Sequence, residues 1–279
     1  MTHPSPRSFV WNGRRLGYET YGEGERVLVL LHGLLMDARL NRGLARSLAH
    51  HGHRVVLLDL LGHGASDKPV HAAEYRLDVY AEQVVTLLDH LRLERVVLGG
   101  LSLGANVSLL VAAGRPERVQ GLILEMPVLE RAVPAAALTF VPALLAVHYA
   151  TPAARVVSRV AGWASRIPSE LLSGLLAPLA SQPEVTAAVL HGILVGPTVP
   201  TVDERRSIGA RALVLGHHAD LIHPFSDAAA LVRQMPDARL VEATSIVELR
   251  LRPRRLVGEI ERFLAEVWDA WTGPVAVSG

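Results

Sequence analysis

The chain has 279 residues, half of them hydrophobic and a fifth charged, which is enough to bury a large core in one domain or in one domain with an insertion. Basic and acidic residues nearly balance at a net charge of +1, so electrostatics gives no reason to expect nucleic acid or an acidic membrane as a partner. The absence of cysteine excludes disulfides and thiolate metal sites and fits a cytoplasmic protein, and Met1 to Arg15 lack the apolar core of a secretory signal.

Short apolar runs alternate with amphipathic stretches over the first half of the chain. Ser8–Trp11 and Arg15–Thr20 flank the Asn12-Gly13 pair, a combination typical of a β-hairpin. The residues Val84, Leu87, Leu88 and Leu91 fall on one face of a predicted helix. Four further runs are typical of buried parallel strands. They are Val27–Leu31, Val55–Leu58, Val96–Leu98 and Leu122–Leu124.

The pattern changes after Pro127 to proline-punctuated segments rich in Ala, Leu and Val, and the strand pattern returns only at Ala212–Leu215. We interpret this as a helical cap over 128–205, inserted between the two parts of a core formed by 1–127 and 206–279.

One stretch of this cap, Ala132–Ala150, is apolar enough to resemble a short membrane span, but Pro134, Pro142 and His148 interrupt it. We therefore expect a buried or cavity-lining helix and no stable membrane insertion. Several large apolar residues of the cap are expected to pack within it, with some of them lining a pocket. They are Phe140, Leu144, Leu145, Tyr149 and Trp163.

The last part of the chain resumes the alternation. Leu240–Val241 has a strand pattern, and apolar residues at helical spacing between Leu256 and Val267 predict a closing amphipathic helix. The fold class predicted is α/β, with a mostly parallel central sheet flanked by helices. In such sheets ligands bind beyond the carboxyl ends of the strands, so the residues that follow each apolar run are the candidates for function.

The segment Gly100-Leu101-Ser102-Leu103-Gly104 follows one predicted strand and precedes an apolar helical stretch. This context is typical of a nucleophile elbow, a sharp turn that exposes a serine hydroxyl. The alternative is a turn serine that bonds to local backbone. After an earlier strand comes His32-Gly33-Leu34-Leu35, and the backbone amides of Leu34 and Leu103 are the natural pair of donors for an oxyanion beside Ser102.

Together with the Asp59–Pro69 and Gly216–Pro224 segments at two other strand ends, these motifs resemble the α/β-hydrolase superfamily, in particular its cap-bearing esterase-like branch. The resemblance implies a fold with an inserted cap, Ser102 as the nucleophile and Asp220 as the acid. A serine at the elbow also separates the chain from the dehalogenases and epoxide hydrolases, which use an aspartate there.

The chain departs from the family after its last strand, where a Gly-His pair is usual. By spacing from Pro253, Ser245 or Ile246 occupies the histidine position, and neither can act as a base at neutral pH. The last histidine in the sequence is His223, which lies three residues past Asp220 in the same loop. The strand before this loop is predicted to lie two places from that of Ser102. We take His223 as a substitute base that Asp220 orients.

Other roles compete for these residues. Asp220 could instead cap a helix that begins near Pro224. His217, His218 and His223 with Asp220 could form a metal ligand set, but adjacent histidines at a strand end point to opposite faces, so we expect neither a metal nor a cofactor.

Four further residues near these motifs need an interpretation. Glu125 is a second-choice acid. Glu248 is either a carboxylate base or an ion-pair partner of Arg250 or Arg252. For His32 and His63 we favour hydrogen bonds that shape their loops.

Two classes of function follow. The first is a serine hydrolase that acts on a small, largely apolar ester or acyl compound through Ser102, His223 and Asp220. The second is a non-hydrolytic protein that keeps the pocket to bind a hydrophobic small molecule, and a lyase or cyclase is a third alternative. In each case the expected partner is a hydrophobic small molecule and not nucleic acid, while the oligomeric state is open between a monomer and a homodimer.

Overall fold

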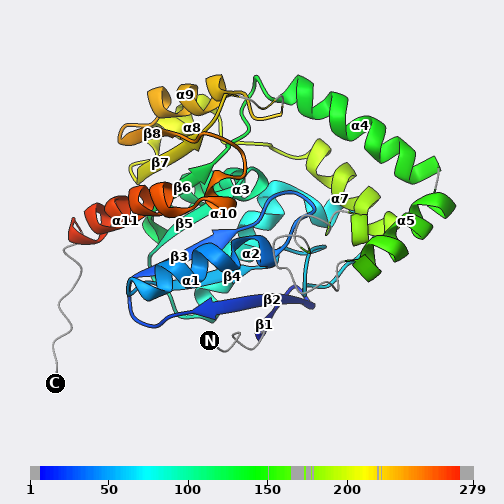
Figure 1. Ribbon diagram of the computed structural model, residues 1–279, viewed down its shortest axis with the longest axis horizontal. Coiled ribbons are helices and arrows are strands. Elements are labelled where there is room, and N and C mark those ends of the chain that lie inside the picture. Colours follow the sequence, from blue (N-terminus) through cyan, green and yellow to red (C-terminus); the bar gives the residue numbers. More distant parts are fainter. Residues whose placement is uncertain are drawn as a thin grey trace.

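One mixed sheet organises the computed structural model, which describes residues 7–149, 151–164, 173, 177, 179–218, 220 and 222–270 (Figure 1). Within these residues the sheet has eight strands in the order β1-β2-β4-β3-β5-β6-β7-β8. Only β1 and β2 run antiparallel to their neighbours. The strands are β1 (Arg7–Trp11), β2 (Arg14–Tyr21), β3 (Val27–Leu31), β4 (Arg54–Leu58), β5 (Val96–Leu101), β6 (Val119–Glu125), β7 (Arg211–Gly216) and β8 (Ala238–Glu242).

Helices cover both faces of this sheet, and a further group lies beyond its carboxyl edge. The helices are α1 (Arg42–His50), α2 (Leu77–His90), α3 (Leu103–Gly114), α4 (Val133–Tyr149), α5 (Thr151–Ala164), α7 (Pro183–Val195), α8 (Val202–Ser207), α9 (Phe225–Gln234), α10 (Glu248–Leu251) and α11 (Arg254–Asp269). The predicted α/β class is therefore confirmed, and each predicted strand is present. The main difference is β5, which continues past the predicted Leu98 through Gly99 and Gly100, because their backbones pair with Leu30 and Leu31 although they have no side chains to signal a strand.

The alternation of side chains along the central strands divides the core into two apolar layers. On one face, residues such as Val29 and Leu31 of β3 pack with α2, α3 and α9. On the other face, the intervening Leu28 and Leu30 pack with α1 and α11. The two layers bury β3, β5 and β6 completely, which is why these strands contain continuous apolar runs in the sequence.

The segment 128–205 holds α4, α5 and α7, and no strand interrupts its described residues. Figure 1 shows α4 and α5 extending along one side of the molecule, away from the sheet. Helix α8 crosses position 205, the predicted end of the cap, so the exact cap boundary stays a prediction.

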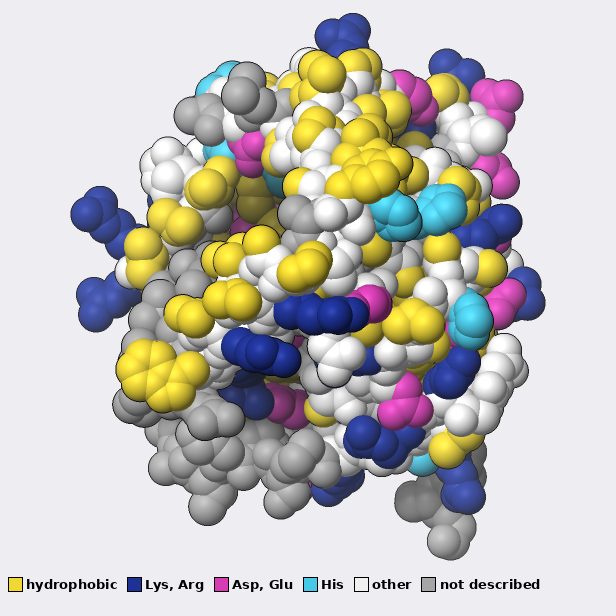
Figure 2. Space-filling view, turned by 90° about the vertical axis from the view of Figure 1, so that its right-hand side faces the viewer, with side chains coloured by type: hydrophobic (Ala, Val, Ile, Leu, Met, Phe, Trp, Pro, Cys, Tyr) yellow, Lys and Arg dark blue, Asp and Glu magenta, His cyan; other side chains and the backbone are white. Residues whose placement is uncertain are grey.

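Helix α4 meets the second of the two alternatives expected of it, because it lines a cavity, and none of its residues is buried. The expectation of packing within the cap is wrong for Leu145, Tyr149 and Trp163, which are 49%, 80% and 73% exposed. The reason is that α4 contacts the body of the protein along only one side, and Figure 2, which views this side of the molecule, shows many apolar side chains at the surface.

Among the described residues, no single helix is both long and apolar enough to cross a membrane. Helices α4 and α5 meet those criteria only as a pair, and the chain bends by 103° between them.

Candidate active site

Ser102 stands on the turn between β5 and α3 with φ of 52° and ψ of −106°, a strained conformation for a residue with a side chain. The glycines on either side make this turn sterically feasible. A Cβ at Gly100 would lie 2.5 Å from the backbone carbonyl carbon of Gly104, and one at Gly104 would lie 2.7 Å from the backbone oxygen of Leu31. The turn is anchored by the Ser102 amide, which donates to the backbone oxygen of Glu125 at 2.8 Å.

The loop after β7 brings His223 and Asp220 to this serine. The Ser102 hydroxyl lies within hydrogen-bond distance of His223, with 2.8 Å between Oγ and Nε2. The other ring nitrogen, Nδ1, lies 2.7 Å from Oδ2 of Asp220. Strands β5 and β7 flank β6 in the sheet, so the predicted separation of two places is confirmed. With Nδ1 as the donor to Asp220, Nε2 is free to accept the serine proton.

Asp220 is fixed by its own loop as well as by the imidazole. Its Oδ1 accepts from the backbone amides of Ile222 at 2.8 Å and His223 at 3.2 Å. Burial acts to raise the pKa of Asp220, but the hydrogen bond and charge interaction with His223, together with these amides, outweigh it and lower the pKa below its usual value. The helix that follows, α9, has no side-chain cap at its start, so the alternative role of Asp220 as a helix cap is wrong.

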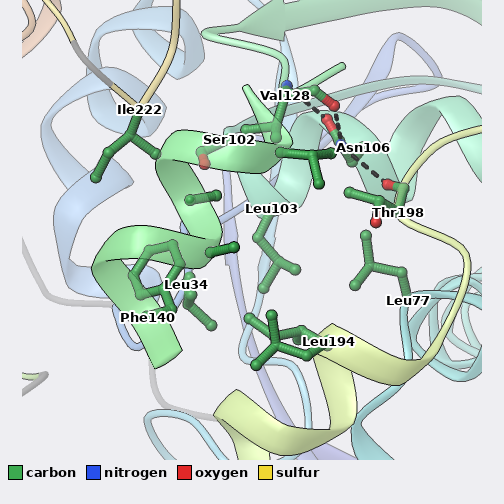
Figure 3. Close-up of a pocket in the computed structure, with 14 residues that line it drawn as sticks. Leu34, Leu77, Ser102, Leu103, Asn106, Val128, Phe140, Leu194, Thr198 and Ile222 are labelled. Carbon is green, nitrogen blue, oxygen red and sulfur yellow. Dashed lines mark hydrogen bonds between the residues drawn. The ribbon is translucent and has the colours of Figure 1, made fainter. Parts of the chain in front are cut away.

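The two residues predicted to supply the oxyanion donors come from different elements. Leu103 is the first residue of α3, where the helix dipole favours negative charge, and Leu34 follows β3. Both residues line a cavity together with Ser102 (Figure 3). Neither amide donates to another described residue. The assignment of this pair as an oxyanion hole stays a prediction.

Two cavities meet at Ser102 and share Leu34, Phe140 and Ile222 as walls. The first, which we call the cap chamber, has a volume of about 150 Å³ and lies against α4 and α7. The second, which we call the loop chamber, has a volume of about 330 Å³ and extends toward α10. The walls of both chambers are largely apolar.

Asn106 is a residue of the site that the sequence did not reveal. Its Nδ2 donates to the backbone oxygens of Val128 at 2.7 Å and Thr198 at 2.8 Å, and its Oδ1 accepts from the Val128 amide (Figure 3). It thereby joins both chain segments that connect α4 and α7 to the core. A polar side chain facing backbone on two distant segments has no local sequence signal, so only the structure could identify it.

A family model for the alpha/beta hydrolase fold matches residues 26–188, which is more than half of the chain. The chain belongs to the α/β-hydrolase family. The haloalkane dehalogenase of Mycolicibacterium paratuberculosis is 30% identical over 80% of this chain and 79% of its own. Among solved structures, the enol-lactonase of Burkholderia xenovorans has a TM-score of 0.76 and 23% identity, with 93% of this chain and all of that chain covered. A thermophilic esterase of Thermogutta terrifontis has a TM-score of 0.74 and 23% identity, with 96% and 99% covered.

In this α/β-hydrolase the second-choice acid, Glu125, is engaged elsewhere. Its carboxylate is paired with the guanidinium of Arg250, and both side chains are nearly buried. The guanidinium also donates to Oδ1 of Asn41 at 3.0 Å. Among the described residues no histidine forms a hydrogen bond with Glu125. The nearby imidazole of His217 lies against the sulfur of Met126.

Glu248 forms an ion pair and is not placed as a base. It pairs with Arg255 at 2.8 Å and accepts from the backbone amide and hydroxyl of Thr244. The prediction of an ion pair is correct, but the partner of Glu248 is neither Arg250 nor Arg252. The short helix α10 turns Arg250 toward Glu125, and Arg255 at the start of α11 faces Glu248 instead.

This pairing predicts a pH-dependent contribution to stability. The hydrogen bond from Arg255, followed by those from Thr244, lowers the pKa of Glu248 from 4.5 to about 2 despite burial. A carboxylate whose pKa is lower in the folded protein than in the unfolded chain stabilises the fold at pH values above its unfolded pKa. This contribution is lost as the pH falls from about 4.5 toward 2. Glu248→Gln should lower the free energy of unfolding by about 1 to 2 kcal/mol at neutral pH. The effect is no larger because Arg255 is half-exposed, so solvent screens its attraction for the carboxylate.

Urea titrations at about pH 7 and pH 3 measure this effect, and the difference between wild type and variant should shrink at the lower pH. Glu242→Gln, which changes a carboxylate that is 59% exposed at the end of β8, is the matched control and should change stability little. A difference that stays constant between the two pH values would contradict the role of the ionised pair.

The remaining histidines shape loops or point apart. His63 accepts from the Leu35 amide and His32 accepts from the Leu60 amide, which confirms the interpretation favoured for both. His218 stacks on Phe225, away from the buried His217. Among the described residues, no group of three or more His, Asp or Glu side chains could hold a metal ion.

Proposed function

We propose that this α/β-hydrolase is a serine-dependent hydrolase that acts on a small, largely apolar ester or acyl compound through an atypical triad of Ser102, His223 and Asp220. The observation that carries the proposal is the 2.8 Å approach of His223 Nε2 to Ser102 Oγ. This distance is within the range over which a general base takes a proton from a nucleophile. The base comes from the loop after β7, which also supplies the acid.

The proposed reaction proceeds in two steps. Ser102 Oγ attacks the carbonyl carbon as its proton passes to Nε2 of His223, and the amides of Leu34 and Leu103 hold the oxyanion. The tetrahedral species expels the leaving oxygen, which takes the proton from His223, and an acyl-serine remains. Water then attacks the acyl carbon, giving its proton to His223, and the acid is released as Ser102 recovers its proton. Asp220 keeps the imidazole in the required tautomer throughout.

The dehalogenase activity named for the mycobacterial relative cannot be assigned to this chain from 30% sequence identity alone. The branch that displaces halide begins from an aspartate at the elbow, and this chain has Ser102 there. A hydroxyl needs an activating base, and His223 is positioned to provide one. Acyl transfer is therefore the chemistry that the site supports best.

The second candidate, a protein that only binds a hydrophobic molecule, draws support from the apolar walls of both chambers. It gives no reason for the strained backbone of Ser102, a conformation that costs about 1 to 3 kcal/mol. It also assigns no role to a carboxylate, an imidazole and a hydroxyl in consecutive hydrogen bonds. A lyase or cyclase would use the pocket without forming an acyl-serine.

A fluorophosphonate probe tests the proposal directly, because it phosphonylates a serine only when a base activates the hydroxyl. We expect the wild-type protein to be labelled within minutes at one site, and mass spectrometry should locate the label on Ser102. Ser102→Ala should abolish labelling. Ser108→Ala, which changes a buried serine of the following helix, α3, should leave labelling unchanged. An unlabelled, folded wild-type protein would overturn the proposal in favour of the binder or the lyase.

A further inference from the structure

The loop chamber lies at the place where the chain departs from its family. Ile246, one of the two residues at the expected histidine position, lines this chamber beside Ser102, and so does Val247. The wall that would present an imidazole is therefore hydrocarbon. The proposed mechanism takes its base from the β7 loop and assigns no part to this wall, so the space beside Ile246 and Val247 is left for a substrate.

The floor of the loop chamber is a separate apolar cluster. Leu40, Leu101 and Met126 are buried against one another with Met36 beside them, and this group belongs to neither of the two layers that pack on the sheet. All four residues line the chamber. Two of them are methionines, whose flexible side chains adapt to ligands of different shape. The volume of about 330 Å³ is within the range of small-molecule sites.

Two charged side chains line the chamber, Asp220 and Arg250, and each is already paired, Asp220 with His223. The Arg250 guanidinium at its wall is paired with Glu125 and bonded to Asn41, and only 8% of the Arg250 side chain is exposed. An anionic group in the chamber would have to compete with Glu125 for it. The chemistry of the walls therefore favours a neutral, apolar occupant.

The position of His223 determines which part of a substrate enters each chamber. In the proposed reaction His223 must return its proton to the leaving oxygen, so the leaving group has to lie on the side where the imidazole is exposed. His223 lines the loop chamber and does not line the cap chamber. The acyl arm then points the other way, into the cap chamber of about 150 Å³ between α4 and α7.

The geometry points to a two-armed substrate, an ester of a short acyl group with a larger, neutral, apolar alcohol that fills the loop chamber. This inference rests on the proposed function and adds which of the two groups of the ester, the acyl group or the alcohol, is the larger. Larger alcohols fit because Ile246 and Val247 replace the expected imidazole wall, while the smaller cap chamber limits the acyl chain.

Two isomeric esters separate the arms at equal overall hydrophobicity. Hexyl acetate carries its long chain on the alcohol, and ethyl hexanoate carries it on the acid. We expect the wild-type kcat/KM for hexyl acetate to exceed that for ethyl hexanoate by about tenfold or more, since each additional methylene in a matching apolar pocket can contribute a factor of about ten. Acid release followed in a pH-stat measures both, with ethyl acetate as the small reference substrate.

A matched pair of variants fills each chamber in turn. Ile246→Trp occupies the loop chamber and should lower kcat/KM for hexyl acetate by about tenfold, which is more than it lowers the value for ethyl acetate. Leu194→Trp occupies the cap chamber from α7 and should affect ethyl hexanoate most. Ile246 and Leu194 are 49% and 40% exposed, so either replacement has room to be accommodated by the fold, which a thermal melt verifies.

The outcomes are distinct. Equal rates for the two isomers, or a preference for ethyl hexanoate, would overturn the assignment of the chambers while the serine hydrolase stands. Hydrolysis of no ester above the Ser102→Ala background would overturn the proposed function and this inference with it. If a tryptophan variant does not fold, the comparison of the isomers in the wild type decides alone.

Discussion

Replacing His223 with alanine is expected to lower kcat for an activated ester such as p-nitrophenyl acetate by about 10⁵- to 10⁶-fold. The reason is that Nε2 is the one described base within hydrogen-bond distance of the Ser102 hydroxyl. One oxyanion donor contributes only about 3 to 4 kcal/mol, so the amides of Leu34 and Leu103 cannot compensate for the loss. Steady-state turnover of the purified variant, corrected for uncatalysed hydrolysis, measures the effect.

The matched control is His218→Ala, a histidine of the same loop whose side chain is 63% exposed and stacks on Phe225. It should retain wild-type kcat within about threefold. A His223→Ala protein with near wild-type turnover would show that the base lies elsewhere and would remove the basis of the atypical triad.

Asp220→Asn is expected to lower kcat by about 10⁴-fold with little change in KM. The carboxylate acts through His223, as a positioning residue: it accepts from Nδ1 and stabilises the imidazolium that forms. Asparagine preserves the shape of the loop, since its oxygen can still accept from the amides of Ile222 and His223, but its amide nitrogen can favour the wrong imidazole tautomer.

A pH–rate profile distinguishes this role from a purely structural one. Because the pKa of Asp220 is lowered, its carboxylate stays ionised through mildly acidic pH in the wild type. The variant removes that charge, so the acid limb of its profile should move to lower pH as the imidazolium loses its stabilising neighbour. Asp203→Asn, at a carboxylate that is 90% exposed on α8, is the control. An unshifted acid limb with full turnover would contradict the role given to Asp220.

The predictions that failed share a cause. Tyr149 and Trp163 were expected to pack within the cap because they are apolar, yet apolar composition does not reveal which side of a helix faces the body of the protein. The partner of Glu248 was expected among its neighbours in sequence, but the turn from α10 to α11 places Arg255 there. Both cases depend on the packing of whole elements, which local pattern does not encode.

The sequence by itself determined the strands, the elbow with Ser102 and the identity of the two candidate partners, because buried strands and strained turns demand particular residues at fixed spacing. It also showed that the position after the last strand has no base. Only the tertiary structure decided that the β7 loop leans far enough for His223 to reach Ser102, that Arg250 engages Glu125, and that two chambers meet at the nucleophile. These contacts join segments more than a hundred residues apart, and their distances follow from how the sheet and its loops pack.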